Sequence, residues 1–438
     1  MAALVWVWWC LRVCAGVREY LALAPNHIAF GDGHIVEWVL VEYPQNVSSS
    51  KDVSVTAVQE SVPELGAWYG LDTGGLAHAA KIVGSTMYAL YAHRTPTSRD
   101  ELWVGGCCAN VLRIFTRDGL FSEIDLDPVV QHAVGTKLAH VSHTFDITEL
   151  SGARVALLIV KYFEASIKAP ADAIVGMRLD GSIVPTADGS TCFRLLDAGT
   201  FSQDRRESVF KMQFYNVSVP DGPSPELRPT SRGEQFHGNG LQRFTTRSGL
   251  QILAFTVCWQ SEAVLFKDPY SYSKSEGGGK ILQRFGSPMF FEKDGSVPNR
   301  FFGLKAGTSP FKYVHNILYH VSSPSFNGHE SLSLFVNSQS GVAAAYEFEL
   351  KVVEEDDDQC HDTVFEVNYV FARCNFSVSA QGGARSIGNG VFLVVDGIHG
   401  EGLFVVDSEG NTKNLPYSGG FRPFYDPFIS VPVVEAVV

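Results

Sequence analysis

The sequence predicts an all-β protein built as a β-propeller, and three observations support this. The composition combines 41 glycines and 12% aromatic residues with only 34 lysines and arginines, which favours strands and tight turns. No long amphipathic helical pattern stands out. Several segments repeat one pattern, in which two apolar strands flank a polar break. With 438 residues, 45% of them hydrophobic, the chain is long enough to bury a large core.

The repeated segments are the predicted blades. Five segments carry the pattern: 102–124, 155–184, 250–268, 331–350 and 388–413. Three of them also contain Asp-Gly or Glu-Gly, which supplies the positive φ that a tight hairpin requires. Such units bury both faces by stacking on their neighbours, so we expect five or six blades. A β-sandwich or two separate β domains is the alternative.

Three polar stretches are predicted to be loops. They are 217–235, 268–280 and the acidic run 354–359, for which calcium binding is a second interpretation.

The N-terminus and the sequons favour the secretory pathway. Residues 1–16 have the apolar core and small residues of a signal peptide, although a truncated or buried strand is the alternative. Residues 17–438 would then form a single propeller domain. Glycosylation sequons begin at Asn46, Asn216 and Asn375. No other apolar run reaches the roughly 18 residues that a membrane-spanning helix needs.

Charge and cysteine spacing exclude two classes of function. The net charge of −13 argues against nucleic-acid binding, which requires clustered cations. No Cys-x-x-Cys pair is present, so a zinc site is not expected. Cys360 and Cys374 could close a disulfide loop, and buried free thiols are an equal alternative.

Histidines just upstream of apolar strands are the candidate functional residues. His143, His237 and His315 occupy this place in different units, so a propeller would bring them together around its central axis. Converging imidazoles can bind a metal, bind an anion or supply a nucleophile. His320 and His329 are predicted to lie on the surface.

Four landmarks follow one another in an order that resembles a known family. They are "FHGNGLQRF" (236–244), "RFGSP" (284–288), "HN" (315–316) before "SLSLFVNSQSG", and "GGARSIGNG" (382–390). Over roughly residues 135–415 the chain resembles the arylsulfate sulfotransferase family. The resemblance implies a six-bladed β-propeller that moves a sulfuryl group from an aryl sulfate donor to a phenolic acceptor. It implies a sulfohistidine intermediate, no nucleotide sulfate donor and no cofactor.

The resemblance also implies roles for individual residues. His315 matches the nucleophile, and His237 and Asn239 match contacts to the sulfate oxygens. His143, three residues before Asp146, matches an earlier His-Asp pair loosely. These donors suit the reaction, because sulfuryl transfer places negative charge on the equatorial oxygens.

The chain departs from the family at two further positions. Asn316 stands where the family has an aspartate, and Val257 or Cys258 stands where it has an arginine. Arg385 lies in a matched motif and is a candidate to replace that arginine.

Two other functions remain open on the sequence. One is a non-catalytic propeller that binds an anionic ligand, a glycan or a protein partner, which the two departures favour. The other is a metal-dependent hydrolase, which lacks a carboxylate near His237 or His315 to complete a metal site. The sequence leaves the oligomeric state open, a homo-oligomer included.

Overall fold

A computed structural model describes most of the chain. The described residues are 16–23, 37–44, 46–58, 76–92, 109–116, 119–165, 169–197, 237–257, 262–286, 301–303, 312–323, 325–339, 342–353, 364–366, 368–376, 382–396, 402–414 and 429–431. Strands dominate them. The helical elements they contain are α3 (Asp127–Val134) and the 3-10 turns η1 (Ser50–Asp52), η2 (Leu195–Asp197) and η3 (Lys274–Glu276).

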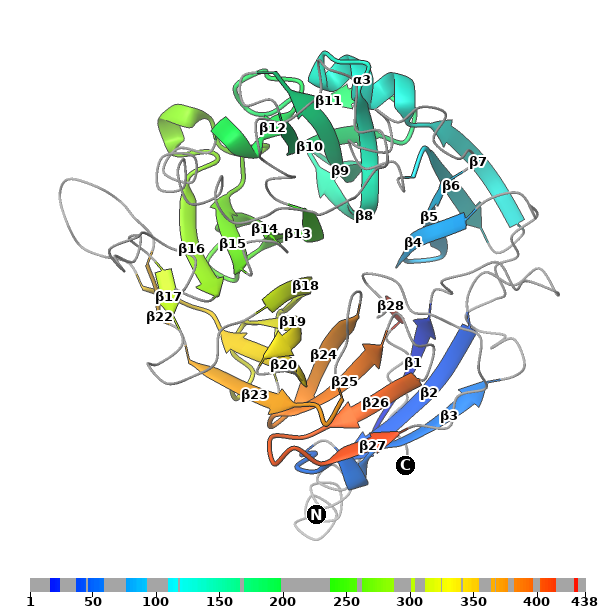
Figure 1. Cartoon of the computed structure of the whole chain (residues 1–438), viewed down its shortest axis with the longest axis vertical. Helices are drawn as coiled ribbons and strands as arrows, with labels where there is room; N and C mark the ends of the chain where they lie inside the picture. The colour runs from blue at the N-terminus through cyan, green and yellow to red at the C-terminus, as the bar shows by residue number, and fades with distance from the viewer. Residues whose placement is uncertain are drawn as a thin grey trace, which may run out of the picture.

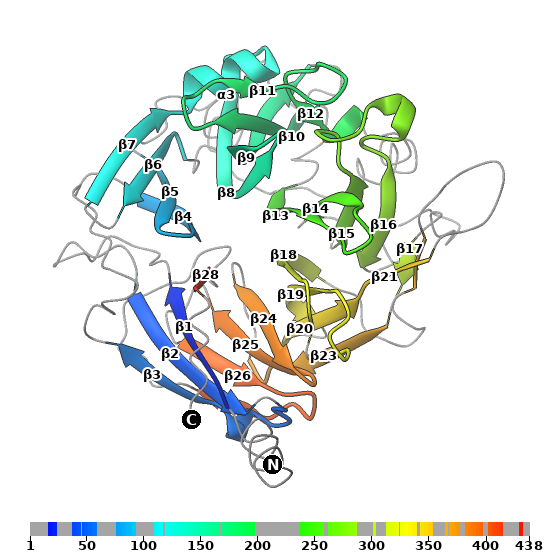
Figure 2. The ribbon, with the colours of Figure 1, turned by 180° about the vertical axis from the view of Figure 1, so that it is seen from behind.

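The described strands form sheets arranged in a ring (Figures 1 and 2). The first three sheets along the chain contain β28-β1-β2-β3, β4-β5-β6-β7 and β11-β10-β9-β8, with β12 pairing on β10. Their bounds are β1 (Gly16–Leu23), β2 (Glu37–Pro44), β3 (Ser54–Val58), β4 (Leu76–Val83), β5 (Thr86–Ala92), β6 (Val111–Thr116), β7 (Gly119–Asp125), β8 (Ala139–Leu150), β9 (Ala153–Glu164), β10 (Ala169–Arg178), β11 (Ile183–Val184), β12 (Phe193–Arg194) and β28 (Ile429–Val431).

The next three sheets contain β13-β14-β15-β16-β17, β18-β19-β20-β23 and β24-β25-β26-β27, and β21 pairs with β22 apart from them. Their bounds are β13 (Gly238–Thr245), β14 (Gln251–Val257), β15 (Glu262–Lys267), β16 (Ile281–Gly286), β17 (Phe301–Gly303), β18 (Lys312–His320), β19 (Ser331–Gln339), β20 (Val342–Glu349), β21 (Lys351–Val353), β22 (Val364–Glu366), β23 (Tyr369–Arg373), β24 (Gly383–Gly388), β25 (Val391–Asp396), β26 (Gly402–Val406) and β27 (Thr412–Asn414). Neighbouring strands are antiparallel, except that β17 joins β16 in parallel. The protein is therefore an all-β β-propeller, as the sequence predicts.

The two ends of the described chain meet in one sheet. β28, close to the C-terminus, pairs antiparallel with β1, close to the N-terminus, over Tyr20↔Val431 to Ala22↔Ile429. The pairing closes the ring, because a strand near each end of the described chain supplies hydrogen bonds to the other.

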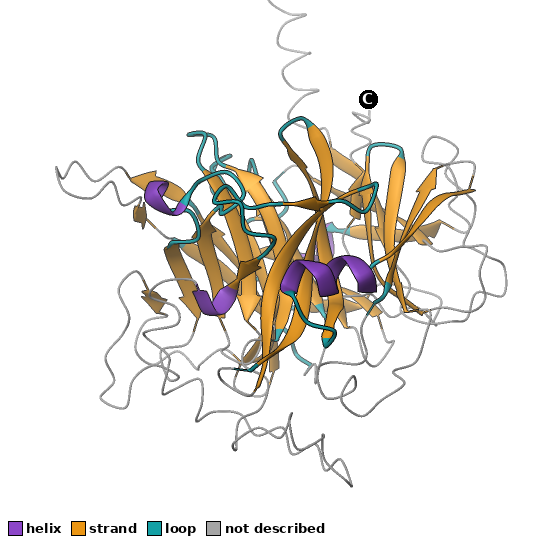
Figure 3. Ribbon diagram, turned by 90° about the horizontal axis from the view of Figure 1, so that it is seen from above, coloured by secondary structure: helices purple, strands orange, loops and turns teal. Residues whose placement is uncertain are grey.

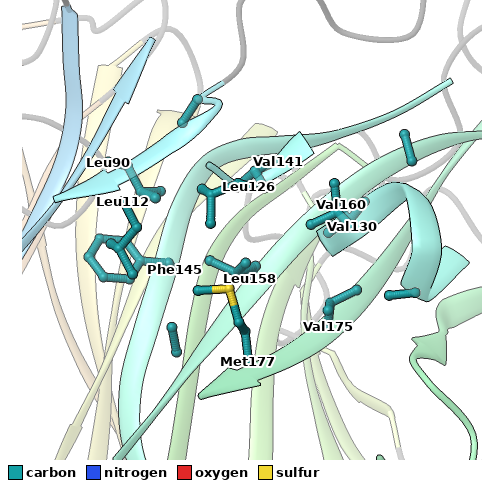
Figure 4. Packing of buried hydrophobic residues seen from close by; sticks show 14 of the residues in the cluster. Leu90, Leu112, Leu126, Val130, Val141, Phe145, Leu158, Val160, Val175 and Met177 are labelled. Atoms are coloured by element: carbon teal, nitrogen blue, oxygen red, sulfur yellow. The ribbon is translucent and has the colours of Figure 1, made fainter. Parts of the chain in front are cut away.

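The cores lie between successive sheets, which explains the continuous apolar runs of the sequence. In β14, Ile252 and Ala254 pack in the core shared with β18–β20, whereas Leu253 and Phe255 pack in the core shared with β9 and β10. A strand with both faces buried reads as an apolar run rather than as an alternation. Figure 4 shows one such core, in which Leu90 and Leu112 meet Phe145 and Leu158 and α3 covers the outer end. The edge-on view shows the sheets standing side by side around the axis (Figure 3).

Polar side chains join three of the sheets to the inner strand of the sheet that follows. An inner strand is a sheet edge, and its buried N–H groups need acceptors. The preceding sheet supplies them. The contacts are Asp172 Oδ2 to Gly238 N (2.7 Å), Asp146 Oδ2 to Arg243 N (2.8 Å), Gln242 Oε1 to Tyr319 N (2.6 Å), Asn316 Oδ1 to Ala384 N (3.2 Å) and Ser333 Oγ to Ser386 N (3.2 Å).

The strand pairs predicted from the sequence are confirmed within the described residues. Segment 155–184 forms β9, β10 and β11, segment 250–268 forms β14 and β15, and segment 331–350 forms β19 and β20. The predicted loop 268–280 is confirmed as turns and η3. Residues 1–15, the loop 217–235, the acidic run 354–359 and Cys360 lie outside the described residues, so the signal peptide and the disulfide remain predictions.

Candidate functional site

Bulges interrupt the inner strands that surround the axis. β4 bulges between Ala77 and Ala79, β13 between Gly238 and Gly240, and β18 between His315 and Ile317. β8 has a wider irregularity between Val141 and Phe145. A bulge turns a side chain away from the regular alternation and is common beside active sites. The bulged residues are His78, Ser142 to Thr144, Asn239 and Asn316.

These four bulges lie at one level of the ring, which means at the same position along its central axis. At the next level, Lys81 Nζ is 3.6 Å from Asp146 Oδ1, Asp146 accepts from Arg243 N, and Gln242 accepts from Tyr319 N. Each bulge lies three residues before its strand's contact at that level: His78 before Lys81, His143 before Asp146, Asn239 before Gln242 and Asn316 before Tyr319. The strands therefore reproduce the same local geometry around the axis. For His78 this is a statement about the backbone alone.

His315 is held between two amide side chains. Its ring is 4% exposed, and Nδ1 lies 2.5 Å from Asn337 Oδ1 while Nε2 lies 2.8 Å from Asn239 Nδ2. An amide oxygen only accepts, so Nδ1 carries the proton, and Nε2 accepts from the Asn239 amide. The two asparagines thus hold a neutral imidazole in one tautomer and one orientation. Asn239 Oδ1 is buried and has no hydrogen-bond partner among the described residues.

The His-Gly-Asn-Gly peptide packs too tightly for other residues. His237 has φ of 56°, in the left-handed region that few non-glycine residues occupy. A Cβ on Gly238 would lie 2.1 Å from the Phe255 ring, and a Cβ on Gly240 would lie 3.1 Å from the Asn316 carbonyl carbon. The glycines therefore let β13 approach both its own sheet and β18, which brings Asn239 to His315.

His143 and His237 lie together. His143 belongs to β8, in the sheet that precedes β13, whereas His315 belongs to β18, in the sheet that follows β13. Their ring centroids are 5.8 Å apart, and His143 is 4% exposed. Ser142 Oγ, beside His143, is buried without a hydrogen-bond partner among the described residues. The structure thus brings together, in two directly contacting pairs, the four residues His143, His237, Asn239 and His315 that the sequence singled out.

A buried ion pair in the preceding sheet binds the His-Gly-Asn-Gly peptide. Asp172 on β10 is fully buried, and its Oδ1 lies 3.6 Å from Lys161 Nζ on β9. Its Oδ2 accepts the Gly238 N–H at 2.7 Å. The carboxylate therefore connects a neighbouring sheet to the residue between His237 and Asn239.

The other predicted site residues have different surroundings. The Asn316 amide bonds the Ala384 backbone at both ends, with Nδ2 donating to the carbonyl at 3.3 Å and Oδ1 accepting from the N–H at 3.2 Å. Asp146 contacts Lys81 and the backbone of Arg243. Val257, at the position of the family arginine, is fully buried in an apolar core, and Cys258 lies outside the described residues.

Arg385 acts on a second polar cluster farther along β18. Burial lowers the pKa of His320 to about 4, Glu347 opposes the shift, and the positive charge of Arg385 adds to it. His320 Nε2 contacts Ser333 Oγ at 2.7 Å, and the buried Glu347 carboxylate accepts from Ser323, Ser331 and Ser386. The prediction that His320 lies on the surface is wrong, because the ring is half-buried in this cluster. His329 is exposed and pairs with Glu349.

Sequence reasoning missed Asn337, Lys161, Asp172 and the β4 bulge at His78. Asn337 ends the apolar strand "SLSLFVN", and a polar residue there is a signal that could have been read. Lys161 and Asp172 each interrupt an apolar strand with a charge, which is a comparable signal. Nothing in the sequence shows that these two charges meet each other or that Asp172 contacts Gly238.

The part of the chain that is described contains neither a metal-binding cluster nor a membrane-spanning helix. No set of three or more His, Cys, Asp and Glu side chains there is arranged to hold a metal ion. No helix within those ranges combines the length and apolarity needed to cross a membrane.

Comparisons with known proteins leave the family of this chain unassigned. No protein-family model matches the sequence, and no curated protein is similar to it. Among solved structures, a sucrose-6-phosphate hydrolase from Lactobacillus gasseri is similar over 96% of this chain and 82% of its own, at 10% identity and a TM-score of 0.26. A likeness of this size carries no argument about the activity of this chain.

Proposed function

We propose that the protein is a sulfuryl transferase of the arylsulfate type, with His315 as the nucleophile. The observation that carries the proposal is the fixed orientation of His315. Asn337 holds the proton on Nδ1, so the lone pair lies on Nε2, which contacts the Asn239 amide. Two residues before Asn239 in the same peptide, the His237 ring packs against the ring of His143. A neutral imidazole with a directed lone pair is a competent nucleophile at neutral pH.

The transfer proceeds in two displacements at sulfur. In the first, Nε2 forms a bond to sulfur as the sulfur–oxygen bond to the donor breaks, and the donor leaves as a phenolate with the bonding electrons. In the second, the acceptor's phenolic oxygen attacks sulfur and the Nε2 lone pair is restored. The acceptor's proton passes to a neighbouring imidazole, His143 or His237.

Asn239 has two roles in this scheme. In the free protein its Nδ2 donates to His315 Nε2, so the amide must release the nitrogen before attack. The same N–H then donates to a sulfuryl oxygen, where negative charge develops and a fixed donor stabilises it. Asn239 Oδ1, buried without a partner in the described ranges, accepts from the phenolic hydroxyl of the acceptor as it binds, before that proton passes to the imidazole. Asn316 takes a structural role in this proposal, because both ends of its amide bind Ala384.

The finer features of the protein belong to the same proposal. We infer six blades, one from each of the six larger sheets, with β28 as the innermost strand of the sheet that also contains β1, β2 and β3. We also infer passage through the secretory pathway. The sequons at Asn46 and Asn375 support this, because both asparagines are exposed.

A non-catalytic propeller that binds an anion is the second candidate. Two observations favour it: Asn239 already occupies His315 Nε2, and Val257, one of the two positions at which the resemblance places an arginine, is buried. Such a protein would bind an aryl sulfate without breaking it.

A transfer assay separates the two candidates. Purified protein receives a chromogenic aryl sulfate and an excess of a second phenol, and release of the first phenol is followed. His315→Ala is compared with His320→Ala, a matched control on the same strand whose imidazole lies in the other cluster. Turnover that needs the acceptor, disappears in His315→Ala and persists in His320→Ala is expected, with a sulfuryl adduct on His315 by mass spectrometry. Equal turnover in both variants, or binding of the donor without turnover in the wild type, would overturn the proposal.

A further inference from the structure

The Lys161–Asp172 pair is a buried charged group that contacts the candidate site and that the proposed chemistry does not use. Both side chains are inside the protein, at 3% and 0% exposure, and they face each other across β9 and β10 in direct register. A buried ion pair adds little net stability, because desolvation offsets its attraction. Its position against the His-Gly-Asn peptide therefore needs a different explanation.

A continuous series of contacts joins the Lys161–Asp172 pair to His315. Lys161 Nζ approaches Asp172 Oδ1 at 3.6 Å, and Asp172 Oδ2 accepts the Gly238 N–H at 2.7 Å. The next residue, Asn239, donates from Nδ2 to His315 Nε2 at 2.8 Å. The carboxylate is two contacts from the proposed nucleophile, although it touches neither the ring nor the sulfuryl position.

The peptide between them needs an external anchor. His237 is held at φ of 56°, and Asn239 is the extra residue of a bulge, so the β13–β14 ladder does not fix this segment in the regular way. A strained conformation persists only where the surrounding structure over-determines it. A charged acceptor makes a stronger hydrogen bond to an N–H group than a neutral one does, which suits it to this task.

We propose that Asp172, held by Lys161, is a positioning residue that sets the placement of Asn239 against His315 Nε2. This inference rests on the proposed roles of His315 and Asn239. It assigns the ion pair the same kind of function that outer-shell hydrogen bonds have at metal sites, which is to orient the groups that perform the chemistry.

The chain contains a matched control for this proposal. Asp146 belongs to the same sheet as Asp172, accepts an N–H of the same strand from Arg243 at 2.8 Å, and has Lys81 Nζ at 3.6 Å. Its contact lies five residues farther along β13, away from the histidines. If these carboxylates serve only to join sheets, their removal should have the same consequences at both positions.

The experiment compares Asp172→Asn and Asp172→Ala with the same two changes at Asp146, all in the full chain. Each variant is measured for its denaturation midpoint, for kcat and KM with the aryl sulfate, and for the ¹⁵N resonances of the His315 ring, assigned with a His315→Gln spectrum. We expect similar falls in midpoint at the two positions. Asp172→Ala should lower kcat by roughly tenfold to a hundredfold more than Asp146→Ala does, with KM changed less than about threefold, because a displaced group costs rate more than binding. Asp172→Asn, which keeps an acceptor oxygen, should recover part of the loss.

The ring resonances keep this test separate from the proposed activity. If the wild type shows no turnover, the function proposed above fails, yet a shift of His315 Nε2 in Asp172→Ala and not in Asp146→Ala would still support the positioning role. Unchanged His315 resonances in Asp172→Ala, or equal effects on kcat at the two positions, would overturn it. Should Asp172→Ala fail to fold, the same comparison is decided on Asp172→Asn against Asp146→Asn.

Discussion

His320 should make the stability of the protein fall as the solution is acidified from neutral pH. Its ring is half-buried on β18 beside Ser333, and burial lowers its pKa from the usual 6.5 to about 4, with Glu347 opposing the shift and Arg385 adding to it. In the unfolded chain the same ring binds a proton near its usual pKa. Between the two values the unfolded state is protonated and the folded state is not, so acid favours unfolding.

The size of the effect follows from the two pKa values. The full difference between the two pKa values corresponds to about 3 kcal/mol of unfolding free energy. All of this stability is lost only at pH values below the pKa of the folded state. Between about pH 7.5 and about pH 5 the unfolded ring takes up its proton while the folded ring does not, which removes about 2 kcal/mol of stability. Above about pH 7 His320 contributes nothing to the pH dependence, because the ring is neutral in both states.

The assay is urea unfolding across this pH range for the wild type, His320→Gln and His132→Gln. Glutamine keeps a polar group near Ser333 but does not titrate, so the free energy of unfolding of His320→Gln should change by about 2 kcal/mol less than that of the wild type. His132→Gln is the control for the loss of an imidazole at the surface, because His132 is exposed on α3. If wild type and His320→Gln lose stability in parallel on acidification, the ring is protonated in the folded state and the reasoning is refuted.

Two further substitutions test the packing of the site. Gly238→Ala places a Cβ against the fully buried Phe255 and should cost about 1–3 kcal/mol of unfolding free energy. This is more than Gly249→Ala should cost, because its Cβ meets open space and only its φ of 88° is unfavourable for alanine; equal midpoints for the two variants would contradict this. Asn316→Asp keeps an acceptor for the Ala384 N–H but turns a carboxylate oxygen toward the Ala384 carbonyl, so we expect a loss of about 1–3 kcal/mol of unfolding free energy. An unchanged midpoint in chemical denaturation would show that Asn316 does not bridge β18 and β24.

The fold was predictable because the strands carry their own signature. Runs such as "LQILAFTV" and "SLSLFV" are apolar on both faces, and only sheets covered on both sides bury such strands. The structure confirms this, since alternate residues of β14 enter different cores. The approach of His143 to His237, and of Asn239 to His315, also follows from placing each residue near the start of an inner strand.

The remaining contacts of the site could not be predicted, for a physical reason. Asp172 meets Gly238 across 66 positions of sequence, and Asn337 meets His315 across 22. Each contact depends on strand register, which a single bulge changes, and no local pattern records where a bulge falls. His320 was misplaced for the same reason, because the cluster that half-buries it is formed by serines of β19 and β24.

The peptide from His237 to Gly240 links the packing of the sheets to the geometry of the candidate site. Gly238 binds the Asp172 carboxylate of the preceding sheet, Asn239 binds His315 of the following sheet, and Gly240 lies against the backbone of Asn316. One tetrapeptide therefore fixes the spacing of three sheets and, in the same contacts, the surroundings of one imidazole. A change that shifts these sheets relative to one another must move Asn239 relative to His315 Nε2. It follows that the residues that control this ring include groups, such as Asp172, that lie outside any list of side chains around the axis.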